Sequence, residues 1–271
     1  QSIKNSLLVV SDRFSTPLEF TLRSFAAYTG YLDHPSTVKV LESHLNRIFP
    51  SSSESLFRSL EISAIHCLDQ QLNSFTQRDL SRWFTTISSS PKPELLIKKP
   101  STLTPAIQAA IDQGILQKDG DDGFYFPHPT IAGFMAARGL RASRPELINR
   151  ILDQADWSLR YEALRFLPAF SDIKPFVNKV QAAPSLFLSK LRISGCWLPQ
   201  LVPKSSEKGY LLKRITQEIH NNQLYINKIR LVMALVKSDS AAAKDILAHL
   251  AKSDDLDTRR AAALGSGLLL D

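Results

Sequence analysis

The side chains that could carry out chemistry are present in this sequence, but their spacing matches no catalytic arrangement. Serine, histidine and aspartate all occur, yet no G-x-S-x-G segment exists to present a serine nucleophile. No G-x-x-x-x-G-K-[ST] segment occurs either, and the 10 glycines are too dispersed to cradle a phosphate group. We therefore predict that the chain is not an enzyme and has no catalytic residue of its own.

The potential metal ligands are equally scattered. Cys67 and Cys196 are the two cysteines, and neither has a partner at metal-ligand spacing. His220 and His249 lie on predicted helices without a ligand partner three or four positions further on. These patterns predict no metal site and no cofactor in this chain. The low cysteine count favours a reducing, cytoplasmic location, and no apolar run approaches the roughly 18 residues that span a bilayer.

The elements around the middle of the chain follow from local signals. Two short apolar runs around an Asp-Gly turn predict a β-hairpin at residues 115–127. Thr76 and Asp79 form a variant of the capping box at the start of one helix. A second helix begins at Thr104 and stops at Gly114, and a third follows the hairpin from Thr130 to about Leu140. Helix, helix and hairpin is the order of a winged helix-turn-helix unit.

Apolar periodicity predicts further helices on the N-terminal side of this unit. Apolar residues recur at helical spacing in three segments, which span residues 6–28, 36–48 and 53–73. The break between the second and third segments is marked by Pro50 and a run of serines. We therefore expect a helical domain before the winged helix.

The residues after the hairpin carry a resemblance to a known family. They read Phe126-Pro127-His128-Pro129-Thr130-Ile131, followed by Phe134-Met135-Ala136-Ala137. This order and spacing resembles the winged-helix end of NACHT-type STAND signalling ATPases. The segment Asn5-Ser6-Leu7-Leu8 looks like the family's Asn-Pro-Leu-Leu start of the helical domain, with Ser6 in place of the proline. The chain departs from many members at Ala132-Gly133, where they have Gln-Glu.

The resemblance implies a role for one histidine. In the family this histidine reaches the phosphates of bound ADP and holds the closed, inactive state, so the resemblance implies that His128 senses nucleotide. Phe126, Thr130 and Phe134 are then the residues that support the motif. An imidazole N–H can donate a charge-assisted hydrogen bond to a phosphate oxygen. The other interpretation is a helix-entry histidine satisfied by the local backbone. The resemblance implies ATP or ADP with Mg²⁺ as the cofactor of a parent protein. It implies none for this chain, because the phosphate-binding loop is absent from this sequence.

The second half of the sequence resembles HEAT repeats. Those repeats carry an aliphatic-arginine pair on the second helix of each helix pair. Four candidates occur here: Leu159-Arg160, Leu191-Arg192, Ile229-Arg230 and, with threonine in the first place, Thr258-Arg259. Their arginines are separated by 32, 38 and 29 residues, close to a two-helix period; they are Arg160, Arg192, Arg230 and Arg259. Each helix pair leaves an apolar face that only a neighbouring pair can bury. We expect stacked pairs with these arginines at equivalent positions.

Charge is distributed unevenly along the chain. Residues 1–140 hold 13 basic and 13 acidic side chains, whereas residues 141–271 hold 20 basic and 13 acidic ones. The second half therefore carries the whole net charge of +7. Its basic residues are scattered, which is typical of a solvated helical surface. The helix before the hairpin has no Lys or Arg and the hairpin turn is acidic, and both features oppose contact with DNA phosphates.

The sequence as a whole predicts an all-α fold apart from one small β-hairpin. We expect a helical domain at 1–74, a winged-helix domain at 75–143 and an α-solenoid of HEAT-like repeats at 144–271. The resemblance implies a regulatory and sensing fragment of a NACHT-type ATPase. Its partners would be the nucleotide-binding domain of the parent protein and a protein ligand, with nucleic acid not favoured and no membrane. The alternative is a standalone helical-repeat scaffold that binds protein or nucleic acid.

Overall fold

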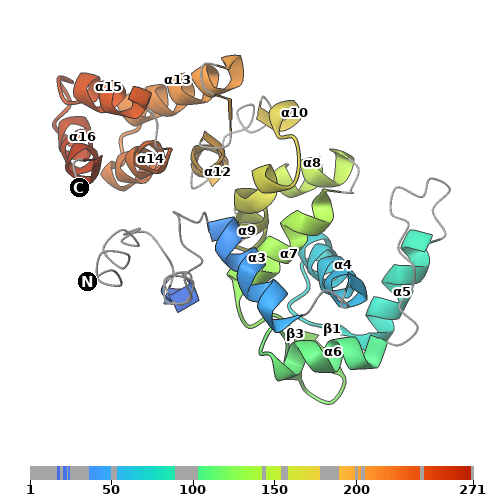
Figure 1. Cartoon of the computed structure of the whole chain (residues 1–271). Helices are drawn as coiled ribbons and strands as arrows, with labels where there is room; N and C mark the ends of the chain where they lie inside the picture. The colour runs from blue at the N-terminus through green and yellow to red at the C-terminus, as the bar shows by residue number, and fades with distance from the viewer. Residues whose placement is uncertain are drawn as a thin grey trace. The chain divides into compact units, whose positions relative to one another are not determined.

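In a computed structural model most of the described residues lie in helices, and residues 75–125 contribute one small sheet (Figure 1). The described residues are 17–18, 21–22, 24, 37–49, 54–88, 103–141, 145–153, 158–177, 189–198, 201–202, 205–238 and 241–269. Residues 5–8 and almost all of the helix predicted at 6–28 lie outside them. The chain divides into an N-terminal unit, residues 1–142, and a C-terminal unit, residues 143–271.

The N-terminal unit has the predicted order of elements, with one addition. Its elements are α3 (Thr37–Ile48), α4 (Glu54–Gln70), β1 (Phe75–Thr76), α5 (Gln77–Ser88), α6 (Leu103–Asp112), β2 (Gln117–Asp119), β3 (Gly123–Tyr125) and α7 (Pro129–Leu140). The helices predicted from residue 36 onward and the hairpin are therefore confirmed, whereas the helix predicted at 6–28 stays a prediction. From α4 to β3 the order is helix, strand, helix, helix and hairpin, which is that of a winged helix-turn-helix unit.

The sheet has three strands, because β1 joins the hairpin. The strand order is β1-β3-β2, and both pairings are antiparallel. Phe124 in β3 lies opposite Phe75 in β1 and Lys118 in β2. The sequence did not predict β1, because a strand of two residues shows no alternating pattern. Its extended form comes from pairing with a distant part of the chain.

Helix α7 is the central helix of the N-terminal unit. Ten of its 12 residues are buried, which is the pattern of a helix that is surrounded on all sides. Its main neighbour is α4, which also packs against α5 and α6. A Cβ on Gly139 would lie 2.6 Å from Ile65 Cδ1, so the glycine permits the close approach of α7 to α4.

Local hydrogen bonds fix the ends of the two helices that flank the hairpin. At the start of α5 the Asp79 amide donates to Thr76 Oγ1 at 3.1 Å, and the Thr76 amide donates to Asp79 Oδ2 at 3.0 Å. This reciprocal pair confirms the predicted capping box. At the end of α6, Gly114 has φ +70°, and the Ile115 amide donates to the Ala110 carbonyl at 2.9 Å. The result is a Schellman cap that turns the chain toward β2.

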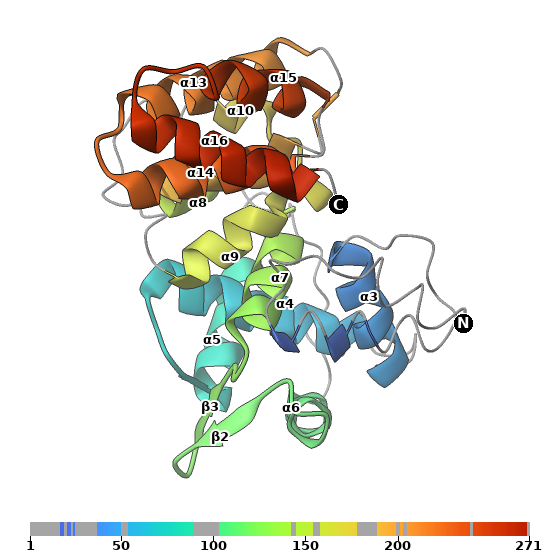
Figure 2. The ribbon, with the colours of Figure 1, turned by 90° about the vertical axis from the view of Figure 1, so that its left-hand side faces the viewer.

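The C-terminal unit is built from helices that contact one another in series. The elements are α8 (Pro145–Asp153), α9 (Ser158–Phe166), the 3₁₀ turn η2 (Leu167–Ala169), α10 (Lys174–Val177), α12 (Ser189–Trp197), α13 (Ser206–Asn221), α14 (Tyr225–Lys237), α15 (Ala241–Leu250) and α16 (Leu256–Leu269). Contacts run from α9 to α12, from α12 to α14 and from α14 to α16. Figure 2 shows α13 and α15 stacked over α14 and α16.

Two features join the successive helices of this series. Trp197 on α12 is fully buried, and its indole N–H donates to the Leu164 carbonyl on α9 at 2.8 Å. Gly195 on the same helix faces Ala234 on α14 so closely that a Cβ at residue 195 would collide with the Ala234 Cβ. The packing of helix pairs against one another agrees with the expected repeats, whereas a HEAT-like solenoid stays a prediction.

The division into two units lies close to one of the two expected domain boundaries and does not reproduce the other. The division falls between Ala142 and Ser143, beside the expected boundary at 143/144. The expected boundary at 74/75 falls between α4 and α5, which pack against each other in one unit. The three domains of the sequence analysis stay a prediction.

Candidate functional site

His128 stands at the entrance of the buried helix α7. Its backbone is extended, with φ −115° and ψ 107°, and Pro129 occupies the first turn of the helix. The His128 carbonyl accepts hydrogen bonds from the amides of Ile131 and Ala132, at 3.0 and 3.1 Å. Its side chain is exposed and makes no capping hydrogen bond to the helix. The backbone of His128 is thus part of the fold, while the imidazole remains open to the solvent.

The residues that support the motif are placed very differently from the histidine. Phe134 is fully buried and Thr130 is 7% exposed. Phe126 is half-buried, with its ring 6.2 Å from the ring of Phe75 in β1. The structure therefore brings all four motif residues to one helix entrance. Three of them pack into the unit, and they fix the point at which His128 leaves it.

A buried carboxylate holds α7 against α4. The Glu61 side chain on α4 is 3% exposed, and its Oε2 lies 2.7 Å from Arg58 Nη1. On the other side Arg138 Nε of α7 lies 2.9 Å from Glu61 Oε1, and the Arg138 guanidinium lies 4.7 Å from the centre of the Phe57 ring. Two cations thus bracket one buried anion. The sequence alone does not reveal this group, because Arg138 lies far along the chain from Arg58 and Glu61.

Titratable groups between α4 and α5 are held neutral by burial. The His66 ring stacks on Trp83 at 4.5 Å and 7° between planes. Burial lowers the pKa of His66 to about 4; the charge of Asp69 opposes this shift, and that of Arg82 adds to it. Burial raises the pKa of the Cys67 thiol to about 12. Such a thiol is neither a nucleophile nor a metal ligand at neutral pH.

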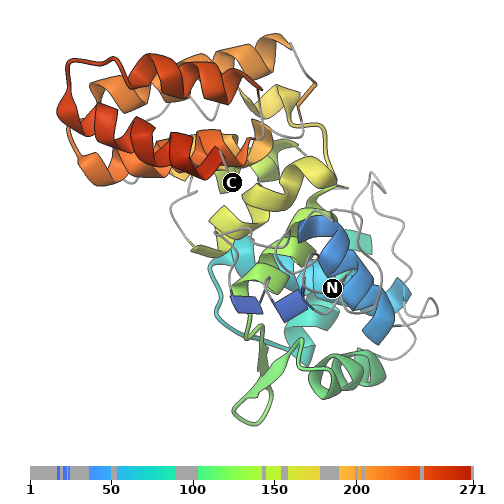
Figure 3. The ribbon, with the colours of Figure 1, turned by 60° about the vertical axis from the view of Figure 1, so that its left-hand side comes forward.

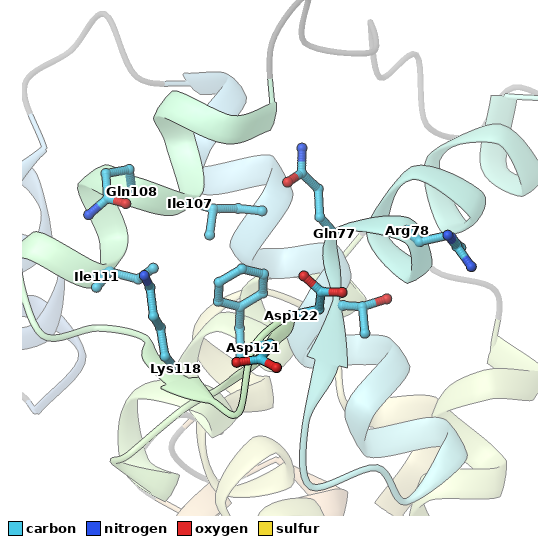
Figure 4. Close-up of a pocket in the computed structure, with 10 residues that line it drawn as sticks. Gln77, Arg78, Ile107, Gln108, Ile111, Lys118, Asp121 and Asp122 are labelled. Carbon is cyan, nitrogen blue, oxygen red and sulfur yellow. The ribbon is translucent and has the colours of Figure 1, made fainter.

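An open cleft of about 450 Å³ lies between α6, the start of α5 and the hairpin. Figures 3 and 4 show α6 beside the hairpin, and Phe124 of the hairpin is among the residues that line the cleft. Its lining residues are Thr76, Gln77, Arg78, Ile107, Gln108, Ile111, Lys118, Asp121, Asp122 and Phe124. The sequence shows that the hairpin turn is acidic, but it does not reveal the cleft. The cleft forms only because α6 packs beside the hairpin in the folded chain.

The four repeat-marking arginines lie on helices of one series, but in different surroundings. Arg160 on α9 is buried, and Arg192 on α12 lies 5.1 Å from the centre of the Tyr161 ring on α9. Arg230 on α14 is half-buried. Arg259 on α16 is exposed, and its Nη1 donates to the carbonyls of Ser253 and Asp254 at 2.7 and 2.9 Å. Each marks one helix of the series α9, α12, α14 and α16, and they do not share one environment.

The residue that bridges two of these helices is a lysine. Lys228 on α14 has a side chain that is 4% exposed, and its Nζ donates to Asp255 Oδ2 at 2.6 Å and to Thr258 Oγ1 at 2.7 Å. Asp255 also accepts from the Thr258 amide at 2.8 Å and so caps α16. The hydrogen bond to Lys228 is the main cause that lowers the pKa of Asp255 below its usual range. The search for arginine pairs missed Lys228, which lies two positions before Arg230.

Other features give no further site. Within the described ranges, no group of three or more His, Cys, Asp or Glu side chains could hold a metal ion. Among the helices that the structure describes, none is long and apolar enough to cross a membrane. Comparison with protein-family models, with curated proteins and with solved structures found no match to this chain.

Proposed function

We propose that this chain is the non-enzymatic regulatory and sensing part of a NACHT-type STAND signalling ATPase. The observation that carries the proposal is the contrast at the entrance of α7. Thr130 and Phe134 are buried and Phe126 is packed on Phe75, whereas the His128 side chain is exposed. A histidine whose role is to complete the fold would be expected to bond within it. A histidine whose neighbours are packed but whose own side chain is exposed is available to a group on another domain.

The chemistry of this position suits an anion. An imidazole N–H donates to phosphate oxygens, and protonation strengthens the bond. His128 also lies at the N-terminal end of α7, where the positive end of the helix dipole favours a negative group. The phosphate of ADP bound, with Mg²⁺, to the nucleotide-binding domain of the parent protein is the proposed partner. Because the sequence has no phosphate-binding loop, the chain would sense nucleotide without hydrolysing it.

The C-terminal unit is proposed to be a HEAT-like surface that binds a protein ligand. The serial contacts of α9, α12, α14 and α16 support the repeats. Exposed apolar side chains at the start of α14, including Leu224 at 61% and Ile226 at 53%, support a protein partner. The same side chains favour the second candidate function, a standalone helical-repeat scaffold. A reducing cytoplasm is the proposed location, since neither Cys67 nor Cys196 is in a disulfide.

The reading frame that encodes the chain decides between the two functions. A G-x-x-x-x-G-K-[ST] segment in frame before Gln1 is expected for the sensing module. In the product of that frame, His128→Ala should weaken retention of ADP by roughly ten-fold or more, because a hydrogen bond to a charged group contributes about 1.5–3 kcal/mol. His249→Ala, an exposed histidine on α15, is the matched control and should have no effect. A frame without a phosphate-binding loop would favour the scaffold.

A further inference from the structure

The cleft beside the hairpin combines an aromatic centre with apolar and charged walls. Ile107 and Ile111 of α6 form one wall, and Thr76 and Gln77 form the other. The half-buried Phe124 of β3 also lines the cleft. On the core side its ring lies 6.0 Å from the ring of Phe75, which is 2% exposed. Phe124 is therefore anchored from behind and presents the rest of its ring to the cleft.

Two carboxylates lie at the edge of this aromatic surface. Asp121 and Asp122 are exposed residues of the hairpin turn, drawn in Figure 4, and they line the same cleft as Phe124. Neither forms an ion pair with a residue in the described part of the chain. Lys118 lies on the opposite side of the cleft, next to Ile111, and Arg78 points away from its centre. The lining thus contains two carboxylates without an ion-pair partner among the described residues, together with the cation Lys118.

We propose that this cleft binds an arginine-bearing segment of a partner protein. The guanidinium group would lie over the Phe124 ring and donate hydrogen bonds to Asp121 and Asp122. A planar cation stacks favourably on an aromatic face, and its forked donors match carboxylate oxygens. Ile107 and Ile111 would contact the apolar side chains that flank the arginine.

Three observations favour this occupant over others. Phosphate groups are repelled by the two carboxylates, and since Arg78 points away from the centre, Lys118 is the one lining cation left to bind them. The cleft of about 450 Å³ is larger than one guanidinium group, so a peptide segment fills it better than a small cation does. Lys118, across the cleft from the carboxylates, can pair with an acidic group or the chain carbonyls of the same segment.

The test uses the whole 271-residue chain and three blocked peptides. The probe is acetyl-Gly-Ser-Leu-Arg-Leu-Ser-Gly-amide, and the matched controls replace arginine by citrulline or by glutamate. Citrulline keeps the shape of arginine and removes its charge. Titrations followed by NMR should show the arginine peptide binding at least ten-fold more tightly than the citrulline peptide. The shifted resonances should be those of β2, β3 and α6.

Variants locate the contact within the hairpin. The double substitution Asp121→Asn and Asp122→Asn should weaken binding of the arginine peptide about ten-fold, and Phe124→Leu should weaken it several-fold. Asp119→Asn changes the same charge on the same hairpin but outside the cleft lining, so it should leave affinity unchanged. Equal affinity for arginine and citrulline peptides, no binding of either, or insensitivity to the double substitution would each overturn the proposal. Tighter binding of duplex DNA than of the peptide at this cleft would also overturn it.

Discussion

In each unit a buried charged side chain joins two helices, and the charges of these two side chains have opposite sign. In the N-terminal unit Glu61 is bracketed by Arg58 and Arg138, so α4 and α7 are joined. In the C-terminal unit Lys228 joins α14 to α16 through Asp255 and Thr258. The partners differ in their access to water. The two arginines are 24% and 21% exposed, whereas Asp255 is 45% exposed.

The two groups therefore differ in whether the partners of the buried charge are themselves shielded from water. Glu61 has both carboxylate oxygens inside the unit and lies against the central helix, so its neutralisation depends wholly on the arginines. Lys228 is buried, but its carboxylate partner is half in water and caps a helix as well. We infer that the first group closes a single packed unit, while the second connects two neighbouring members of a series.

Removal of Glu61 should have the largest effect. Glu61→Ala leaves Arg58 and Arg138 facing each other across a buried space, and breaking a buried ion pair costs about 3–5 kcal/mol. Denaturant unfolding should show this fall in the free energy of unfolding. Asp257→Ala is the control, because its pair with Arg260 is exposed and should contribute under about 1 kcal/mol. Equal, small losses in both variants would contradict the assigned role of Glu61.

Removal of the Lys228 charge should cost less. In Lys228→Met the half-exposed Asp255 stays hydrated and keeps its hydrogen bonds to Thr258, so we expect a loss of about 1–3 kcal/mol. Hydrogen exchange should quicken in α14 and α16 and stay unchanged in α4 and α7. Lys213→Met, at an exposed position of α13, should be neutral. A change confined to α13 would show that Lys228 does not join the two helices.

Packing between the helices of the series should be sensitive to one methyl group. Gly195→Ala forces a collision with Ala234, and overpacking of this kind costs about 1–3 kcal/mol. The added substitution Ala234→Gly should recover part of the loss. Gly209→Ala on α13, where a Cβ meets open space, should instead stabilise by about 0.4–1 kcal/mol. Thermal unfolding of the three variants measures these effects, and a harmless Gly195→Ala would disprove the close contact.

A fall in pH should lower the stability of the N-terminal unit before that of the C-terminal unit, and this effect should be smaller than those of the substitutions above. Since the pKa of His66 falls to about 4 in the folded chain, the unfolded state binds more protons than the folded state at pH values between 4 and 6.5. Stability is therefore present above pH 6.5 and is lost as the pH falls toward 4. His66 is partly exposed, so we expect a loss of about 1 kcal/mol.

A phenylalanine variant tests this origin of the pH dependence. His66→Phe keeps the stack on Trp83 and removes the titrating group. Hydrogen exchange in α4 should then vary less with pH across this range. Asp255 also has a lowered pKa, so it stays charged across this range and its contribution is lost only at lower pH; α14 and α16 should therefore hold their protection. An unchanged pH profile in the variant would assign the effect to other groups, such as His44, whose pKa burial also lowers.

The sequence predicted those features that depend on neighbouring residues. The cap formed by Thr76 and Asp79, the helix stop at Gly114 and the hairpin beyond it are all encoded within a few positions. The burial of Thr130 and Phe134 beside an exposed His128 could not be read from the motif alone. It depends on α4, which covers most of α7 but not its entrance.

Features that join distant segments were not predictable in the same way. Strand β1 exists because β3 pairs with it, and the cleft exists because α6 lies beside the hairpin. The four arginines lie on α9, α12, α14 and α16, yet the ion pair that joins α14 to α16 comes from Lys228. That the four arginines mark equivalent positions of a repeat stays a prediction. The side chain that bridges two helices depends on the angle and depth at which they pack, which a periodic pattern does not contain.

The pairing of β1 with β3 also bears on the order in which the chain folds. Phe75 and Phe124 lie far apart in sequence, with two helices between them, so their contact requires closure of a long loop. The pairs α13–α14 and α15–α16 need only short turns to meet. Local contacts form faster than distant ones. The small sheet, and with it the cleft and the chain leading into α7, should therefore be completed after the helix pairs of the C-terminal unit.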